Sequence, residues 1–278
     1  MSAGRGSGGR GGDDNKRRRS GASKFPVPED TVIDVNIADR LRRVVETDAS
    51  VPQVQALTNY RRPLLVRGSS SFIPKGMAAE DQFDQFREVR TRLEAMAASF
   101  DLRYFTTLVV SMTPGAGVSF VARNLAAAFT LQGRRAAVLM DCNVRNPTQH
   151  LALGSRPDGG GLFDYLTDPT ERIEHLICPT AIAGLHLIPA GHPSSRFREY
   201  FSSPAMRLVM SELRNEPSCV FMDGPPALGS PDARILSEFA DFVVLVVGYG
   251  RGKPDEIAQA AALFDPAKFA GAIFNQRA

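Results

Sequence analysis

The chain has 278 residues, 43% of them apolar, with a net charge of +3, which favours one large domain with extensions. No apolar run approaches about 18 residues, and the glycine- and arginine-rich start has no apolar segment, so neither a transmembrane helix nor a secretory signal is predicted and a cytoplasmic location is expected. The three cysteines and four histidines lack metal-ligand spacing, and no Ser/His/Asp signature is present, which argues against a zinc site and a serine hydrolase.

Residues 1–30 are expected to form a disordered basic tail. Residues 1–24 carry seven basic side chains against two acidic ones, so the basic balance belongs to the tail rather than to the fold. Two interpretations of the run 16–19, Lys-Arg-Arg-Arg, remain open. It either contacts an anionic membrane, an acidic partner or nucleic acid, or it is simply solvated. No aromatic residues are interleaved, so no specific nucleic-acid partner is expected.

Residues 31–79 are expected to hold an amphipathic segment and a linker. Apolar residues recur at helical spacing within 32–45, which predicts a short amphipathic helix. Residues 47–75 contain three prolines and a run of serines, which is typical of a linker with weak structure.

A firmer helix is predicted over 80–96, where apolar side chains fall on one side. Asp84, Arg87 and Arg90 share one face of this helix, and both arginines are expected to be exposed. That face is either a contact between subunits or plain surface.

From residue 106 onward, strand and helix patterns alternate. The predicted strands are 108–111, 136–140, 185–188, 219–222, 242–247 and 270–274. The predicted helices are 119–132, a short one ending at 166, 204–215, 232–239 and 254–264. Apolar strands separated by helices predict an α/β fold with a doubly wound, mainly parallel sheet flanked by helices, occupying residues 80–278.

A glycine-containing loop, residues 113–119, follows the first of these strands and leads into a helix. Strand, glycine loop and helix N-terminus are the layout of a phosphate cradle, as in P-loop NTPases. Val118 stands where the P-loop pattern has a lysine, and Met112 where the strict pattern has its first glycine. Valine can neither donate to a phosphate nor neutralise it.

Two carboxylates follow buried strands further along the chain. Asp141 ends the run 136–140 and Asp223 ends the run 219–222. Carboxylates at the carboxyl ends of strands beside a phosphate loop are where nucleotide-binding α/β folds hold Mg²⁺.

These motifs resemble the bacterial tyrosine kinases of capsule and exopolysaccharide synthesis. Residues 114–119, Pro-Gly-Ala-Gly-Val-Ser, match P-G-x-G-K-S, and residues 141–145, Asp-Cys-Asn-Val-Arg, match D-x-D-x-R. Residues 223–226, Asp-Gly-Pro-Pro, match D-x-P-P, and residues 84–90 match the E-x-x-R-x-x-R helix. The resemblance covers about residues 80–275.

The resemblance implies a site for ATP or ADP with Mg²⁺. Its nucleotide contacts would be Gly115, Ala116, Gly117, Val118, Ser119, Phe120, Arg145 and Asn275. Ser119, Asp141 and Asp223 would hold Mg²⁺, and the two aspartates would be catalytic in an active enzyme. Asp84, Arg87 and Arg90 would mediate contacts in a homo- or hetero-oligomer.

Three departures weaken the chemistry that the resemblance implies. Val118 replaces the phosphate lysine, Asn143 replaces the second acidic residue, and the family's tyrosine-rich tail is absent. Nucleotide binding is therefore expected to be weak or absent. The favoured hypothesis is a pseudokinase that serves capsule, exopolysaccharide or holdfast-type polysaccharide synthesis and export by binding a membrane-spanning co-polymerase or export protein, which would place it at the inner membrane.

Two alternatives stay open. The chain could be an active autokinase or ATPase with an unusual loop, in which Arg123, one helical turn after Ser119, reaches back toward a phosphate. An exposed Arg123 is the favoured expectation, because most arginines lie at the surface. A relative of the partition ATPases is less favoured, since Thr113 and Pro114 stand where that group carries lysine and glycine.

Overall fold

The computed structural model describes residues 65–67, 77–130, 135–144, 147–153, 155, 160–169, 173–192, 197–248 and 252–276. The predicted basic tail, the predicted helix within 32–45 and the candidate site residue Arg145 lie outside these residues.

The described residues form one eight-stranded sheet, with the strand order β1-β8-β7-β2-β6-β3-β5-β4. Its strands are β1 (Leu65–Arg67), β2 (Thr106–Ser111), β3 (Ala136–Asp141), β4 (Cys178–Pro179), β5 (Leu185–Ile188), β6 (Ser218–Asp223), β7 (Phe242–Gly248) and β8 (Phe269–Gln276). All neighbours pair in parallel except β4 and β5, which are antiparallel.

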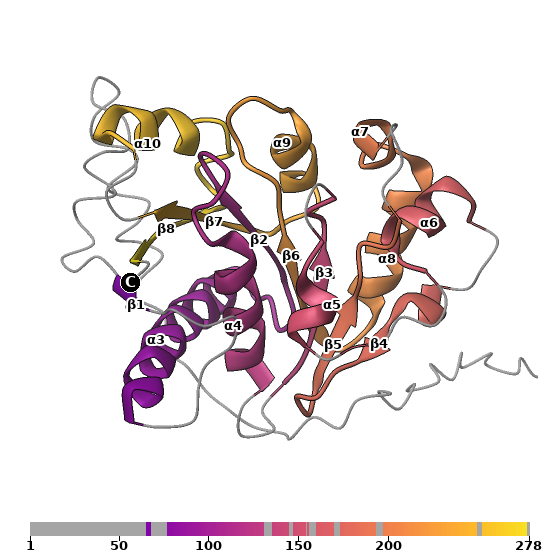
Figure 1. The fold of residues 1–278 in the computed structure, drawn as a ribbon, viewed down its shortest axis with the longest axis horizontal. Coiled ribbons are helices and arrows are strands. Elements are labelled where there is room, and N and C mark those ends of the chain that lie inside the picture. Colours follow the sequence, from indigo (N-terminus) through magenta and orange to yellow (C-terminus); the bar gives the residue numbers. More distant parts are fainter. Residues whose placement is uncertain are drawn as a thin grey trace, which may run out of the picture.

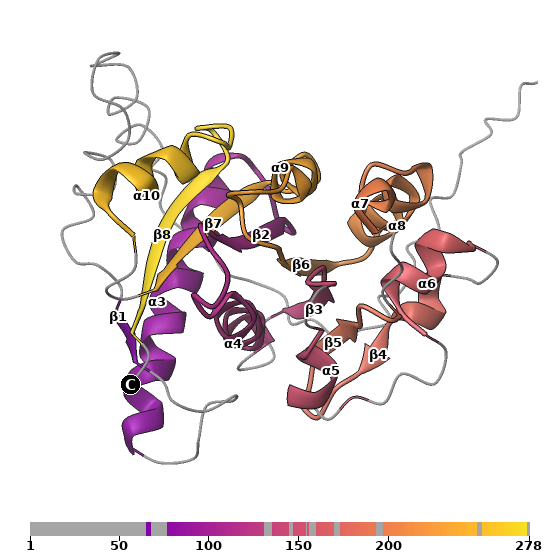
Figure 2. The same cartoon turned by 45° about the horizontal axis from the view of Figure 1, so that its top comes forward.

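Helices cover both faces of this sheet (Figures 1 and 2). They are α3 (Met77–Ser99), α4 (Val118–Thr130), α5 (Gln149–Ala152), α6 (Leu162–Thr167), the 3₁₀ helix η2 (Ile173–Leu176), α7 (Phe197–Tyr200), α8 (Pro204–Asn215), α9 (Asp232–Ser237) and α10 (Pro254–Ala261). Figure 2 shows α3, α4 and α5 on one side of the strands and α9 and α10 on the other. The predicted doubly wound α/β fold is confirmed.

Two apolar cores lie on the two faces of the sheet, because side chains of a strand alternate in direction. Val109 of β2 belongs to the core under α3 and α4, whereas Val110 belongs to the core under α8, α9 and α10. Every residue of β2, β3, β6 and β7 is buried. Such strands read as continuous apolar runs, which is why they could be predicted without an alternating pattern.

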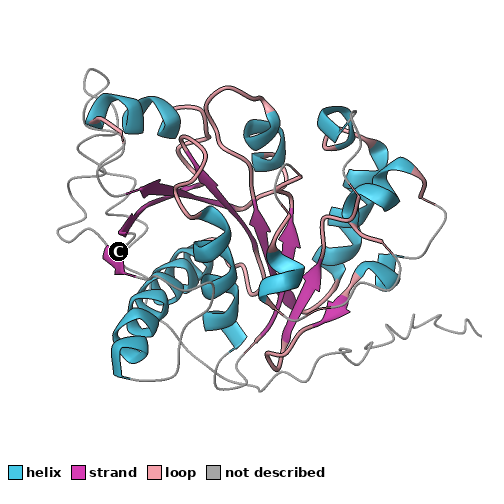
Figure 3. Cartoon of the chain, in the orientation of Figure 1, coloured by secondary structure: helices cyan, strands magenta, loops and turns pink. Residues whose placement is uncertain are grey.

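The six predicted strands are all present (Figure 3), but the sheet has two further edge strands. The sequence predicts that residues 65–67 lie in a linker, but they pair in parallel with Phe274–Gln276. The two-residue strand β4, which contains Pro179, was not predicted. Both are very short and lie at the edges, where a strand needs no apolar run and where proline is tolerated.

Helix α8 shows how local sequence sets an element's limits. Ser203 precedes it as the N-cap, and its hydroxyl accepts a hydrogen bond of 3.1 Å from the amide of Met206. Pro204 occupies the first turn, where its missing N–H costs no helical hydrogen bond. The helix runs from Pro204 to Asn215, as the sequence predicts.

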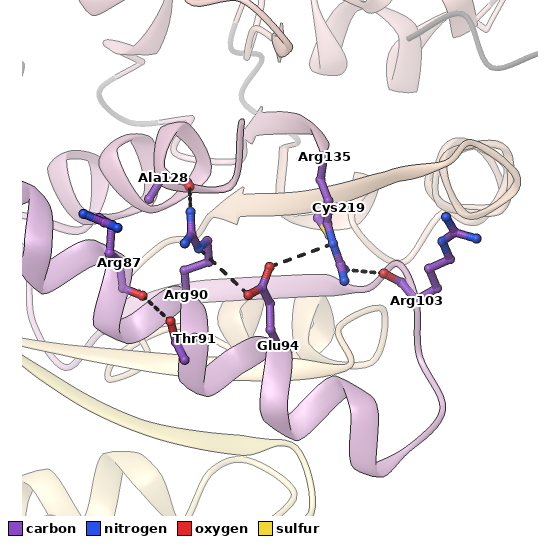
Figure 4. A network of polar contacts seen from close by, with 8 residues as sticks. All are labelled: Arg87, Arg90, Thr91, Glu94, Arg103, Ala128, Arg135 and Cys219. Carbon is purple, nitrogen blue, oxygen red and sulfur yellow. Dashed lines mark hydrogen bonds and ion pairs between the residues drawn. The ribbon is translucent and has the colours of Figure 1, made fainter. Parts of the chain in front are cut away.

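Helix α3 packs on α4 with the predicted apolar side, including Phe86 and Leu93, buried. The prediction that Arg90 is exposed is wrong, since only 6% of it is accessible. Its Nη1 donates a 2.8 Å hydrogen bond to the carbonyl of Ala128, near the C-terminus of α4 (Figure 4). Carbonyls there lack helical partners and attract cations, which explains why an arginine is buried at this point. Arg87 is exposed, as predicted.

Glu94 and Arg135 complete this contact (Figure 4). Oxygens of Glu94 lie 3.9 Å from Nε of Arg90 and 3.9 Å from Nε of Arg135. Arg135 also donates to the carbonyl of Arg103. We call Arg90, Glu94 and Arg135 the α3–α4 clamp, because they tie α3 to α4 and to the start of β3.

Candidate functional site

The predicted phosphate loop connects β2 to α4 at the carboxyl end of the sheet. Gly115 and Gly117 adopt φ angles of 82° and 90°, a region in which a side chain is strained. A Cβ added to Gly117 would lie 2.1 Å from Nδ2 of Asn275. That amide donates a 2.9 Å hydrogen bond to the carbonyl of Ala116. Gly117 therefore allows β8 to approach the loop closely, and Asn275 holds the loop from one side.

Val118, at the position of the P-loop lysine, is the first residue of α4 and is 8% exposed. It belongs to the apolar core between α3, α4 and the sheet. Phe120 is half-buried, with its ring edge-on to that of Phe86 at a centroid distance of 6.0 Å. The start of α4 thus directs apolar side chains into the core and has no cation at the lysine position.

The register of the sheet brings the two predicted carboxylates together. β3 and β6 are parallel neighbours, and Asp141 pairs directly with Asp223 at their carboxyl ends. Both aspartates are 0% exposed. Gln149, the first residue of α5, is equally buried. We call Ser119, Asp141, Gln149 and Asp223 the carboxylate corner.

Gln149 holds the corner together. Its backbone amide donates to Oδ2 of Asp141 at 3.3 Å. Its side-chain Nε2 donates to Oδ2 of Asp223 at 2.7 Å and to the carbonyl of Ser119 at 3.0 Å. The sequence predicts that Ser119, Asp141 and Asp223 share a site, and the structure does bring them together. Gln149 was missed, because an isolated glutamine eight residues after Asp141 carries no recognisable pattern.

Arg123 completes the arrangement, and the prediction that it is exposed is wrong. Only 3% of Arg123 is accessible, and its Nη1 donates a 2.8 Å hydrogen bond to Oε1 of Gln149. Its place one turn after Ser119 puts it on the face of α4 that looks toward α5 and the strand ends. The helical spacing could have indicated this face, but not the polar group that meets it.

Burial dominates the electrostatics of the corner. It raises the pKa of Asp223 to about 6, although hydrogen bonds from the side chains of Gln149 and Ser119 lower it. Burial, followed by the charge of Asp223, also raises the pKa of Asp141 well above its ordinary value. Burial lowers the pKa of Arg123, and the two aspartates oppose that effect. The corner therefore holds one buried cation beside two carboxyl groups that resist ionising together.

The corner does not fit Mg²⁺ in this arrangement, although oxygen ligands of the right kind converge on it. Both oxygens of Asp141 accept backbone N–H groups, from Asn143 and Gln149. Oδ2 of Asp223 accepts a hydrogen bond from the side-chain amide of Gln149. Of the four carboxylate oxygens of Asp141 and Asp223, only Oδ1 of Asp223 has no hydrogen-bond partner among the described residues. Over the same residues, no cluster of three or more His, Cys, Asp or Glu side chains could hold a metal ion.

Asp84 lies in α3, in a part whose side chains are not described, and Asn143 is half-buried. The three cysteines are not in disulfides, and Cys142 and Cys219 are buried. A search of the described helices finds none with the length and hydropathy needed to span a membrane.

Comparison with known proteins agrees with the motifs. No family model matches the chain. It is 31% identical over 204 residues to the tyrosine-protein kinase YwqD of Bacillus subtilis, an alignment that covers 73% of this chain and 82% of YwqD. It is 26% identical to the tyrosine-protein kinase Wzc of Salmonella typhimurium over 78% of this chain. The chain spans only 28% of the length of Wzc and 30% of the length of EpsB of Ralstonia solanacearum.

Solved structures show the same fold. The chimerical protein CapA2B2 matches 80% of this chain with a TM-score of 0.66 and 26% identity. The kinase domain of the Escherichia coli tyrosine kinase ETK matches 82% with the same TM-score, at 18% identity. With the phosphate loop, the two strand-end aspartates and the similarity to YwqD taken together, the chain belongs to the bacterial tyrosine-protein kinase family.

Proposed function

We propose that this chain serves the synthesis and export of a surface polysaccharide by binding partners, and not by phosphoryl transfer. Its relatives include tyrosine-protein kinases and the succinoglycan biosynthesis transport protein ExoP of Rhizobium meliloti. The partner would be a membrane-spanning co-polymerase or export protein, and the chain would act beside it at the inner membrane.

Val118 is the observation that carries the proposal. Phosphoryl transfer depends on cations that stabilise the charge on the transferred group, and a single lost donor costs about 10²–10³ in rate. Val118 is packed into the apolar core, so the lysine position is used for stability. Asn143 removes a carboxylate from the same region. A family fold with an altered site fits a scaffold better than a catalyst.

Calorimetric titration with Mg-ATP and Mg-ADP tests the altered site. The wild-type chain is expected to give no saturable heat at micromolar concentrations. Val118→Lys should strengthen ADP binding, because it restores a cation at the loop, while Val118→Leu keeps the apolar character and serves as the control. Low-micromolar binding of Mg-ATP by the wild type would contradict the proposal.

Gene deletion tests the cellular role. Deletion should reduce or abolish a surface polysaccharide or a polysaccharide adhesin. Copies carrying Asp141→Asn or Asp223→Asn should restore it substantially, because a scaffold needs the fold and not the carboxylates. The two variants must be expressed at the wild-type level. If both fail to restore the polymer, nucleotide chemistry matters and the scaffold proposal is wrong.

An active autokinase or ATPase is the second candidate, favoured by one observation. The loop keeps its positive-φ glycines and the register keeps Asp141 beside Asp223, so the backbone of the site is intact. Incubation with labelled ATP distinguishes the two candidates. Label on tyrosine, or ATP turnover that Asp223→Asn abolishes, would favour the enzyme. An unlabelled and inactive chain would favour the scaffold.

A further inference from the structure

Arg123 places a cation, and Gln149 places hydrogen-bond donors, at the part of the carboxylate corner where a metal ion would bind. Gln149 contacts all three residues predicted to hold the metal. Its side-chain amide donates to Asp223 and to the backbone carbonyl of Ser119, and its backbone N–H donates to Asp141. Arg123 donates to the same glutamine at 2.8 Å. All of these side chains but that of Ser119 are buried, so the contacts are shielded from water.

We propose that Arg123 and Gln149 act as an internal substitute for the divalent cation, so that the corner stays assembled without metal and excludes it. Gln149 supplies an N–H donor to one oxygen of each aspartate, where the ion would otherwise bind. Arg123 supplies the positive charge that two neighbouring carboxyl groups require in a buried site.

The contacts show why the pair acts as a unit. A glutamine amide carries no net charge and could not by itself offset Asp141 and Asp223. Its Oε1 accepts from Arg123 while its Nε2 donates to Asp223, so the amide links the guanidinium to the carboxylates. A buried polar network of this kind is stable only when its members are satisfied together. Removing either member should therefore expose carboxylate oxygens to a new cation.

A divalent ion would meet two obstacles in the wild-type corner. It would have to displace the Gln149 amide from Asp223, and it would lie beside a fixed guanidinium of the same sign. Arg123→Met removes the charge but keeps much of the volume. Gln149→Leu removes the side-chain donor to Asp223 and keeps the backbone N–H that donates to Asp141. Arg92→Met is the matched control, because Arg92 is a half-buried arginine of α3 that pairs with Glu88 at 2.9 Å and is not part of the corner.

Binding of Mn²⁺, used alone as the probe, tests the proposal on the full chain. The free ion is counted from its electron paramagnetic resonance signal, without nucleotide or any activity assay. Wild type and Arg92→Met should bind Mn²⁺ only weakly. Arg123→Met and Gln149→Leu should each bind it about tenfold more tightly or better. Mg²⁺ should compete, and adding Asp223→Asn to Arg123→Met should abolish the gain.

Two results would overturn the proposal. One is tight Mn²⁺ binding by the wild type. The other is a folded Arg123→Met or Gln149→Leu variant that gains nothing. Should Arg123→Met fail to fold, Arg123→Gln keeps a hydrogen-bonding side chain and gives the same comparison. The inference rests on the proposed function only in treating the corner as the former metal site. If the wild type binds nucleotide and the variants still bind Mn²⁺ more tightly than the wild type, the scaffold role is refuted. The proposal that Arg123 and Gln149 replace the divalent cation would still hold.

Discussion

The two ends of helix α4 each bury an arginine, but they use it differently. At the C-terminal end, Arg90 of α3 donates to the carbonyl of Ala128, where a cation is favoured by unpaired backbone acceptors. At the N-terminal end, Arg123 reaches Gln149 beside two carboxyl groups. Helix N-termini favour anions, which suits the two aspartates beside the N-terminus of α4. A buried arginine is tolerated at this end because the two carboxyl groups lie next to it.

The arginine at one end of α4 has a structural role, and the arginine at the other end belongs to the candidate site. Arg90 contacts a backbone group that exists in any helix, so its role is to fix α3 against α4. Arg123 contacts side chains that only this site brings together. Removing Arg90 should therefore act on stability, whereas removing Arg123 should act on what the corner binds. The experiments below test this division.

The largest expected effect is that of Arg90→Glu, which should lower the free energy of unfolding by about 3–5 kcal/mol. The change places a second carboxylate beside Glu94 in a buried position and leaves the carbonyl of Ala128 without its donor. Urea denaturation measures the effect. Arg87→Glu, three residues away and exposed, should change stability by less than about 1 kcal/mol. Equal losses in the two variants would show that the clamp does not stabilise the fold.

The second effect is a pH dependence that belongs to Asp223. Its pKa is about 6 in the folded chain, against an ordinary value of 3.8. Between these values the folded state binds more protons than the unfolded state, so the free energy of unfolding should fall as the pH rises from about 4 to about 6. A shift of this size corresponds to about 3 kcal/mol.

Asp223→Asn should flatten this pH profile, because the amide does not titrate. Denaturant midpoints at pH 4, 5, 6 and 7 give the comparison. The charge of Asp223 also contributes to the raised pKa of Asp141, so the variant should weaken both contributions. If the wild type and the variant have parallel profiles, the carboxylate corner does not control the stability in this range.

The third effect is smaller and concerns the loop. Gly117→Ala should destabilise the fold by about 1–3 kcal/mol, because φ is 90° and the new Cβ would meet the Asn275 amide. Asn275→Ala removes that obstacle. In the double variant, Gly117→Ala should therefore cost less than it does alone, by an interaction energy that a double-mutant cycle measures. Strictly additive effects would mean that Asn275 does not restrain the loop.

Arg87→Glu is expected to change the free energy of unfolding least, and it also tests assembly. Arg87 lies exposed on the face of α3 that is either a subunit contact, as the family resemblance implies, or plain surface. Arg87→Glu should lower the mass seen by light scattering, or abolish pull-down of a membrane partner, without a change in the denaturation midpoint. Arg92→Met is the control on the same helix. An unchanged mass and an unchanged pull-down would leave this face as plain surface.

Much of the fold followed from local patterns. Six strands could be predicted because buried parallel strands are continuous apolar runs, and α8 because Ser203 and Pro204 mark its start. The edge strand β1 could not, because three residues form it only through pairing with β8. For the site, sequence order alone places Asp141 and Asp223 at strand ends, since each follows its own apolar run.

What the sequence by itself determined is therefore the α/β order of elements, the glycine loop, the substitution at Val118 and the family. Only the tertiary structure decided where the charges lie. Two of the three arginines predicted to be at the surface, Arg90 and Arg123, are buried, because each contacts a partner more than 25 residues away in the chain. Helical periodicity shows which side chains share a face, but the polar group that meets that face depends on how distant segments pack.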